Sequence, residues 1–394
     1  MNFVKWMCRS LKKIWLFAFV IVLSFNFLYK VHASDKPKLN LASESAVLVD
    51  STTGKVLYEK NAFKRLYPAS LTKIATAIYA IENGNLNDTV TISKNVENTD
   101  GTRVYLVAGE KVTLKHLLQG LLINSGNDAG VAIAEYMNGS IPKFASQLNQ
   151  YLVDKIGVSA TNFVNPHGLF DENHYTTAYD LAKITNYAIK NDIFKQIFGT
   201  KELEWNGEGW QTTLFTHHLI LKGEIEYKEV TGGKTGYVDQ SGQTLATTAE
   251  NDKIHLTVII MNAKSKNDAY NDTKKLLDYG FNHFETSTLA KGVTFKVGEE
   301  IFEAPKDIEY TKPLNGTVSE DILDDGMLQI SDRSGDTLDT LKLTPMKVKA
   351  AETKPEVTEK QTTQPSKNWS LYFVIFAFLL ILTVIIKKIN QKRM

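Results

Sequence analysis

The chain has 394 residues, enough for one large domain with a smaller one, or for two domains of medium size. Its 45 basic and 44 acidic residues leave a formal net charge of +1, so the charge predicts no binding to nucleic acid or to another polyanion. One cysteine and eight histidines, without paired ligand spacings, predict neither a disulfide framework nor a metal site.

Residues 1–33 have the pattern of a secretory signal. Basic residues precede an apolar run that begins at Ile14, and Val31 and Ala33 stand where small residues precede a signal-peptidase cut. We therefore expect cleavage after Ala33, with an uncleaved anchor as the alternative. Because the only cysteine lies in this segment, the mature protein would contain none, which favours a bacterial envelope protein.

Residues 34–286 predict a large domain of the α/β (α+β) class. Residues 45–60 suggest two strands around a Thr-Gly turn, and residues 70–191 carry apolar side chains mainly at helical spacing. Strand character returns over 228–262, with a hairpin turn at Asn251-Asp252, and residues 272–284 predict a closing helix. This order favours an antiparallel sheet flanked by helices, with a helical region inserted between its first and last strands.

Residues 287–394 fall into four segments that differ in composition. Residues 287–347 predict a small all-β domain, and residues 348–367 have too little apolar mass to fold, so they predict a flexible stalk. Residues 368–386 form an uncharged apolar run long enough to cross a bilayer, followed by a basic tail over 387–394 that should stay cytoplasmic. The expected location is the cell membrane, with one span and the body outside the cell.

Ser-x-x-Lys is a weak motif, and the chain contains it three times, as Ser10/Lys13, Ser70/Lys73 and Ser140/Lys143. The first copy lies in the signal segment and the third contains a proline. Ser70 opens a good apolar helix, and positions three apart share a helix face, so Lys73 can reach its hydroxyl. Taken alone, the pattern still favours a helix cap at Ser70 over a nucleophile.

Two more motifs favour the interpretation of Ser70 as a nucleophile. Ser125-Gly126-Asn127 supplies Ser-x-Asn at the junction of two helical runs, and Lys234-Thr235-Gly236 is the only Lys-Thr-Gly in the chain. The last motif lies in the strand-rich part. The three motifs are individually weak, but their order and spacing form a strong combination.

This combination resembles the penicillin-binding and serine β-lactamase superfamily, and within it the low-molecular-weight D-alanyl-D-alanine carboxypeptidases. The resemblance covers roughly residues 40–285. It extends beyond the tripeptides to the stretches AVLVDSTTGKVLYEKN, YPASLTKIATA, LLINSGNDA, NPHGL, HYTTAYDLAKI and GGKTGY.

The resemblance implies a role for each matched residue. Ser70 would be the nucleophile, Lys73 its base and Ser125 a proton relay to the leaving amine. The implied substrate-binding residues are Asn127, Lys234, Thr235, Gly236 and Tyr237. The implied substrate is a peptidoglycan stem peptide ending in D-Ala-D-Ala, β-lactam antibiotics would act as inhibitors, and neither a cofactor nor a metal would be needed.

Departures from the family pattern leave alternatives open. An arginine common after the last core strand is absent, and only Lys264 and Lys266 stand there. One alternative is a β-lactamase, but the ExxLN motif of class A enzymes is missing; another is a non-catalytic receptor for penicillin or wall fragments. We expect His167 and His174 to order their loop, and His217 and His218 to lie on an exposed rim beside the cleft.

Overall fold

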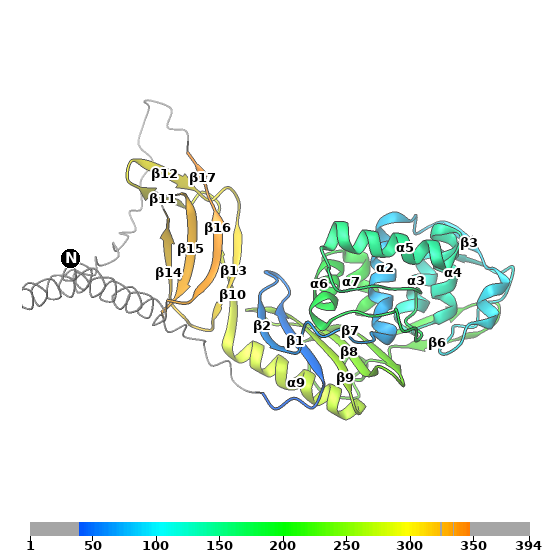
Figure 1. Ribbon diagram of the computed structural model, residues 1–394. Helices are drawn as coiled ribbons and strands as arrows, with labels where there is room; N and C mark the ends of the chain where they lie inside the picture. The colour runs from blue at the N-terminus through cyan, green and yellow to red at the C-terminus, as the bar shows by residue number, and fades with distance from the viewer. Residues whose placement is uncertain (1–38, 324, 334, 347–394) are drawn as a thin grey trace, which may run out of the picture. The chain divides into compact units, whose positions relative to one another are not determined.

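The computed structural model describes residues 39–346, apart from residues 324 and 334 (Figure 1). These residues form two compact units, one of 39–288 with 309–316 and one of 289–308 with 317–346. The predicted signal segment, stalk, membrane span and basic tail lie outside the described residues. Within residues 39–346 the structure has no helix long and apolar enough to cross a membrane.

The first unit is built on a five-stranded antiparallel sheet. Its strand order is β2-β1-β9-β8-β7, so strands from the two ends of the unit pair at its centre, with Ala46 of β1 opposite Ile260 of β9. The predicted antiparallel sheet, including the hairpin at Asn251-Asp252, is confirmed. The strand bounds are β1 Ser45–Asp50, β2 Val56–Lys60, β7 Val230–Val238, β8 Gly242–Glu250 and β9 His255–Ala263.

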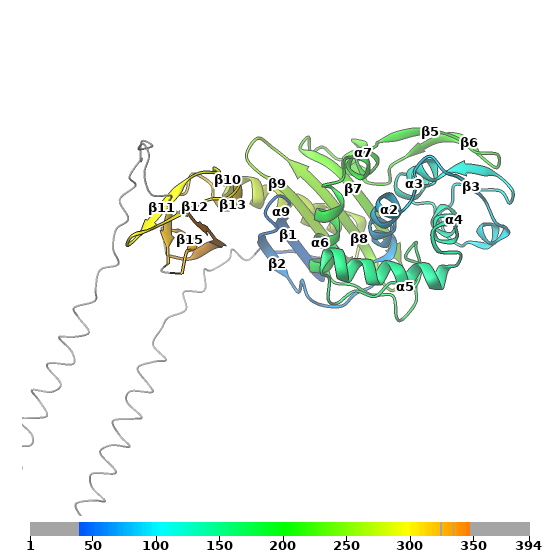
Figure 2. The ribbon, with the colours of Figure 1, turned by 90° about the horizontal axis from the view of Figure 1, so that it is seen from above.

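Successive apolar side chains of the central strands point to opposite sides, so both faces of the sheet are apolar. In β1, Val47 and Val49 join one buried cluster, whereas Ala46 and Leu48 join another. Successive side chains of a strand point to opposite faces, so this alternation requires cover on both sides. The helix α9 (Lys266–His283) packs into the second cluster, and the helical region packs into the first, as Figures 1 and 2 show.

The helical region lies between β2 and β7 in sequence, as expected. Its helices are α2 Thr72–Asn83, α3 Leu114–Leu122, α4 Asn127–Asn138, α5 Ile141–Tyr151, α6 Ala178–Ala188, α7 Asp192–Phe198 and α8 Leu219–Lys222, with short turns η1 Ala69–Leu71, η2 Lys94–Asn98 and η3 Leu152–Ile156. Two small hairpins that the sequence did not predict interrupt it: β3 Thr89–Thr91 with β4 Lys111–Thr113, and β5 Glu202–Asn206 with β6 Gln211–Phe215.

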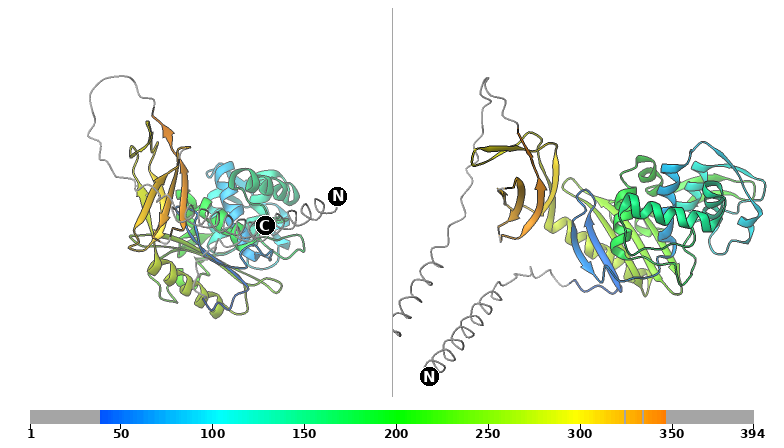
Figure 3. Two further views of the ribbon diagram at one scale, coloured as in Figure 1. Left: turned by 60° about the vertical axis from the view of Figure 1, so that its left-hand side comes forward. Right: turned by 45° about the horizontal axis from the view of Figure 1, so that its top comes forward.

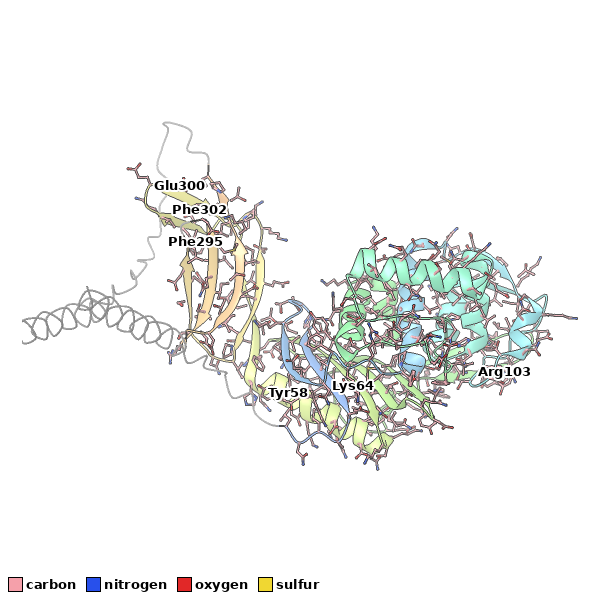
Figure 4. All side chains as sticks on the ribbon, viewed as in Figure 1. Tyr58, Lys64, Arg103, Phe295, Glu300 and Phe302 are labelled. Carbon is pink, nitrogen blue, oxygen red and sulfur yellow. The ribbon has the colours of Figure 1, made fainter. Side chains whose placement is uncertain are left out.

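The second unit contains only strands among its described residues (Figure 3). Its sheets are β11-β12-β17 and β14-β15-β16, whereas β10 pairs with β13 in a separate sheet whose residues belong almost entirely to the first unit. Phe295 and Phe302, labelled in Figure 4, come from β11 and β12 and are buried. The bounds are β10 Phe284–Leu289, β11 Thr294–Val297, β12 Glu300–Glu303, β13 Ile308–Pro313, β14 Val318–Ile322, β15 Met327–Asp332, β16 Thr337–Lys342 and β17 Thr344–Pro345.

Candidate active site

Ser70 lies in the turn η1 that leads into α2, and its side chain caps neither helix. Its Oγ instead accepts a hydrogen bond from Lys73 Nζ at 2.8 Å. Ser140, with the same spacing to Lys143, behaves differently: its Oγ accepts from the Lys143 backbone nitrogen at 3.4 Å and caps α5. The same motif therefore gives a helix cap at one place and a serine–lysine pair at the other.

Lys73 is fully buried, and its amine has three oxygen partners, of which Ser70 Oγ is one. Nζ donates to Asn127 Oδ1 and to the His167 carbonyl oxygen, each at 2.7 Å. Both oxygens can only accept hydrogen bonds. An ammonium donates to all three oxygens, Ser70 Oγ included. In the neutral amine, which has two N–H groups and one lone pair, these two oxygens take the N–H groups and the Ser70 hydroxyl can donate to the lone pair, as a general base requires.

The electrostatics favour the same neutral form. Burial, and after it the positive charge of Lys234, hold the pKa of Lys73 well below its usual range, while the Asp128 carboxylate acts in the opposite direction. Removing an ammonium from water penalises its charged form, and a neighbouring cation adds to that penalty. Both causes favour the neutral amine of Lys73.

Asn127 presents its oxygen to Lys73 because its nitrogen has another partner. Nδ2 donates to the Asp100 carbonyl oxygen at 2.7 Å, which fixes the orientation of the amide. The backbone nitrogen of Asn127 also donates to the Thr102 carbonyl oxygen at 2.7 Å. The first residue of α4 is therefore held between Lys73 and the loop at Asp100–Thr102.

Lys234 on β7 and Ser125 before α4 form the opposite side of the site. Lys234 Nζ donates to Ser125 Oγ and to the Thr235 carbonyl oxygen, each at 2.9 Å. Burial lowers the pKa of Lys234 to about 7. Ser125 has a φ of 64°, a left-handed conformation that is uncommon outside glycine. Such strain is typical of residues that the surrounding structure holds in place for function.

Strand β7 passes directly against the backbone of Ser70. A Cβ added to Gly236 would lie 2.4 Å from Thr244 Oγ1 and 2.8 Å from the Ser70 nitrogen, so only glycine fits. Thr244 Oγ1 in turn donates to the Pro68 carbonyl oxygen at 3.0 Å. The next residue, Tyr237, is 56% exposed. Thus the Lys-Thr-Gly strand and the Ser-x-x-Lys turn, far apart in sequence, are packed together.

The loop around residue 167 supports the serine from the other side. Gly168 has a φ of 88°, and a Cβ there would lie 1.8 Å from the Ala69 carbonyl oxygen. Burial lowers the pKa of His167 to about 3 and that of His174 to about 4, so both rings are neutral near neutral pH. His174 Nδ1 accepts from the Val164 nitrogen at 3.1 Å, and its Nε2 lies 2.8 Å from Thr72 Oγ1. These bonds agree with the expected loop-ordering role.

The expectation of an exposed histidine rim is wrong for His218. His217 is exposed, but His218 is fully buried, and its ring lies where a Cβ on Gly233 would come within 2.2 Å. Its Nε2 lies 2.8 Å from Thr247 Oγ1. Glycine on β7 leaves room for the ring, so the strand that carries Lys234 rests on His218.

Asp128 is a buried residue whose role the sequence did not reveal, although it stands next to Asn127. Its carboxylate accepts from the backbone nitrogens of Val104 at 3.0 Å and Leu106 at 3.1 Å. Burial raises the pKa of Asp128, and these backbone hydrogen bonds lower it. The available signal was a carboxylate directly before the apolar run of α4, where a buried charge needs partners. Residues 39–346 hold no cluster of side chains suited to a metal ion.

A serine hydroxyl in contact with a buried lysine amine, with a second lysine and serine opposite, defines an active-serine hydrolase site. Comparisons with known proteins agree with this class. The model of peptidase family S11, described as D-alanyl-D-alanine carboxypeptidase, matches residues 30–265. The chain therefore belongs to the D-alanyl-D-alanine carboxypeptidase family.

Individual relatives support the assignment. The chain is 35% identical over 256 residues to D-alanyl-D-alanine carboxypeptidase DacF of Bacillus subtilis, covering 63% of this chain and 64% of that protein. It is 31% identical over 318 residues to DacA of Haemophilus influenzae, covering 75% of each. The chain thus spans just under two thirds of the DacF length.

Solved structures show the same fold. Penicillin-binding protein 5 from Haemophilus influenzae matches with a TM-score of 0.70 and 27% identity, over 78% of this chain and 97% of that one. A Streptomyces K15 DD-transpeptidase matches with a TM-score of 0.58 and 27% identity, over 62% of this chain and 99% of that one. The mixed α/β fold with an antiparallel sheet is therefore that of the DD-peptidases.

Proposed function

We propose that this protein is a serine-type D-Ala-D-Ala carboxypeptidase that removes the terminal D-alanine from peptidoglycan stem peptides and is acylated by penicillin. The observation that carries the proposal is the contact of Lys73 Nζ with Ser70 Oγ at 2.8 Å, with two carbonyl-type oxygens occupying the amine's donors. The substrate class comes from the family to which the chain belongs.

The proposed acylation begins with the neutral Lys73. Its lone pair takes the hydroxyl proton while Ser70 Oγ forms a bond to the carbonyl carbon between the two D-alanines. The developing oxyanion is stabilised by the backbone N–H groups of Ser70 and Tyr237. The position of Gly236 against the Ser70 nitrogen supports this pairing. A donor of this kind is typically worth about 3 kcal/mol.

The proposed binding groups hold the two ends of the scissile bond. Lys234 and Thr235, next to Gly236 on β7, bind the carboxylate of the terminal D-alanine, and the Asn127 amide holds the substrate amide on the acyl side. Ser125 Oγ, 2.9 Å from Lys234 Nζ, relays to the departing amine the proton that Lys73 took from Ser70, which leaves Lys73 neutral again. Water then attacks the ester, and the shortened peptide leaves with Ser70 regenerated.

The β-lactamase alternative lacks a carboxylate to activate the deacylating water. Among the described residues, Lys73 bonds to a hydroxyl and to two carbonyl-type oxygens, not to an acidic side chain. The buried Asp128 accepts hydrogen bonds from backbone amides. The receptor alternative leaves the neutral base beside Ser70 without a purpose. Both observations support the carboxypeptidase proposal.

The proposal is tested with a fluorescent penicillin and a peptide ending in D-Ala-D-Ala. We expect covalent labelling and D-alanine release by the wild type, and the loss of both in Ser70→Ala. Ser140→Ala, which removes the helix-capping copy of the motif, is the matched control and should keep both. Labelling that survives in Ser70→Ala refutes the nucleophile; labelling without any D-alanine release by the wild type favours the receptor.

We further propose that the protein acts outside the cell, anchored by residues 368–386, with residues 348–367 as the stalk and residues 387–394 in the cytoplasm. The uncharged apolar run and the basic residues after it support this orientation. Protease added to intact protoplasts should remove the catalytic unit and leave a short C-terminal fragment in the membrane. Full protection of the chain would contradict this topology.

A further inference from the structure

The loop at residues 100–106 is tied to the proposed substrate-binding residues. Asp100 and Thr102 accept hydrogen bonds from Asn127, and Asp128 accepts from the nitrogens of Val104 and Leu106. In addition, Asn124 Nδ2 donates to the Arg103 carbonyl oxygen at 2.9 Å. The backbone of this loop is therefore fixed to the residues around Asn127.

Tyr105, in the same loop, is a strained and exposed aromatic residue. Its φ is 56°, and its side chain is 49% exposed. A left-handed conformation is unfavourable for a non-glycine residue. The β5–β6 hairpin supports it: the Trp210 ring meets the Tyr105 ring edge-on at 5.2 Å, and a Cβ on Gly209 would lie 2.2 Å from the Tyr105 carbonyl oxygen. The fold thus maintains an exposed ring at an energetic cost.

Arg103 adds a positive charge to this ring. Its guanidinium carbon lies 5.0 Å from the Tyr105 ring centroid, a cation–π arrangement. Nη1 donates to the Glu97 carbonyl oxygen at 3.1 Å, and among residues 39–346 no carboxylate pairs with this guanidinium. Arg103, labelled in Figure 4, lies on the loops beyond α4. An uncompensated guanidinium with free donors suits a carboxylate ligand.

We infer that Arg103 and Tyr105 form a specificity subsite for the part of the stem peptide upstream of the scissile bond. The inference rests on the proposed function. Asn127 holds the amide on the acyl side of that bond, so the preceding residue extends towards the loop bonded to Asn127. The subsite packs the aliphatic part of that residue's side chain on the Tyr105 ring and pairs its terminal carboxylate with Arg103.

The ligand is thereby defined by its chemistry: a residue before the two D-alanines whose side chain has an aliphatic part and ends in a free carboxylate. A carboxamide in its place keeps the shape but loses the charge. A partly exposed ion pair is worth up to about 1 kcal/mol, so we expect about a fivefold preference in kcat/KM. Salt should weaken this preference, because exposed charges are screened.

The test uses two synthetic N-acyl peptides, each with such a residue before D-Ala-D-Ala, that differ only in that carboxylate or carboxamide. The measured quantity is the ratio of their kcat/KM values for D-alanine release, at low and high salt. Arg103→Gln should reduce the ratio from about five to about one, whereas Arg103→Lys should keep part of it.

Arg65→Gln is the matched control, because the Arg65 guanidinium lies 4.7 Å from the Tyr175 ring centroid in another loop. It removes the same charge and the same kind of contact, and should keep the full ratio. A wild-type ratio of one, or a ratio unchanged in Arg103→Gln, overturns the subsite. Absence of D-alanine release from both peptides refutes the proposed function instead, and the subsite with it.

Discussion

Lys73 and Lys234 are both buried in the site, but they lie on different elements and have different hydrogen-bond partners. Lys73 lies on a helix, three residues after Ser70, and its amine contacts a hydroxyl and two carbonyl-type oxygens. Lys234 lies on a strand and contacts one hydroxyl and one backbone carbonyl. Lys73 therefore has three oxygen partners, one of them the serine, whereas Lys234 has two and keeps a donor for an incoming group.

The two lysines also differ in what lowers their pKa values. Burial lowers the pKa of both amines, but the charge of Lys234 adds to the effect at Lys73. The neutral form of Lys73 is favoured, whereas Lys234, with a pKa of about 7, is close to its midpoint near pH 7 and can bind a carboxylate as an ammonium. The comparison shows that one residue type takes two opposite roles through hydrogen-bond partners and neighbouring charge.

We expect the largest effect from replacing Lys73, the lysine on the helix. Lys73→Met keeps the length of the side chain but removes the base, so the rate of covalent labelling by penicillin should fall by about 10²–10⁴-fold. Lys143→Met is the matched control from the capping copy of the motif, where the backbone nitrogen makes the bond. A labelling time course measures both rates; a loss of less than tenfold in Lys73→Met would rule out this base.

An intermediate effect tests the support beneath Ser70. Gly168 and Gly139 both have positive φ, but a Cβ at Gly168 would lie 1.8 Å from the Ala69 carbonyl oxygen, whereas Gly139 has open space. Gly139→Ala should cost about 1 kcal/mol of stability and leave labelling unchanged. Gly168→Ala should displace Ser70 and reduce the acylation rate about a hundredfold. Equal labelling rates in the two variants would contradict the close packing.

We expect a smaller effect from changing Lys234, the lysine on strand β7. Because Lys234 loses its proton as the pH rises through about 7, kcat/KM for D-alanine release should fall above that pH. In Lys234→Arg the guanidinium stays charged, so the alkaline limb should move to higher pH, with a maximum lower by about tenfold. A pH profile from 5 to 10 measures this. An alkaline limb that stays near 7 in Lys234→Arg would assign it to another group.

The same pKa shift predicts the sign of a stability change. The unfolded chain holds the Lys234 proton up to the usual pKa of 10.5, whereas the folded chain releases it at about 7. Between these values the unfolded state binds more protons, so this residue makes the free energy of unfolding rise with pH across that window. Denaturant titrations of the wild type and Lys234→Met, compared at pH 7 and pH 10, isolate the contribution.

Much of the sheet could be predicted from the sequence, because its signals are local. The Thr-Gly turn before β2 and the Asn251-Asp252 turn before β9 mark hairpins directly. The pair of Ser70 and Lys73 could also be predicted, since three residues separate them on one helix face. The three-residue strands β3 and β4 are too short to show an alternating pattern, which explains why they were missed.

The rest of the site depends on tertiary packing. Ala69 and Ser125 have φ values of 48° and 64°, which no propensity of alanine or serine predicts. The His167 carbonyl reaches Lys73 only because Gly168 lets its loop approach the Ala69 carbonyl. Likewise His218 is buried because Gly233 leaves space above its ring. Each case depends on a neighbour remote in the sequence.

The pairing of β1 with β9 has a consequence for biogenesis. Strand β9 separates the hairpin of β1 and β2 from that of β7 and β8, so the sheet cannot be completed without it. A growing polypeptide that ends before His255 already carries all three motifs, yet its two hairpins have no common partner. Closing so long a loop is entropically costly and slow. Assembly is therefore delayed until almost the whole catalytic unit has been synthesised, which leaves the early segments dependent on protection from aggregation.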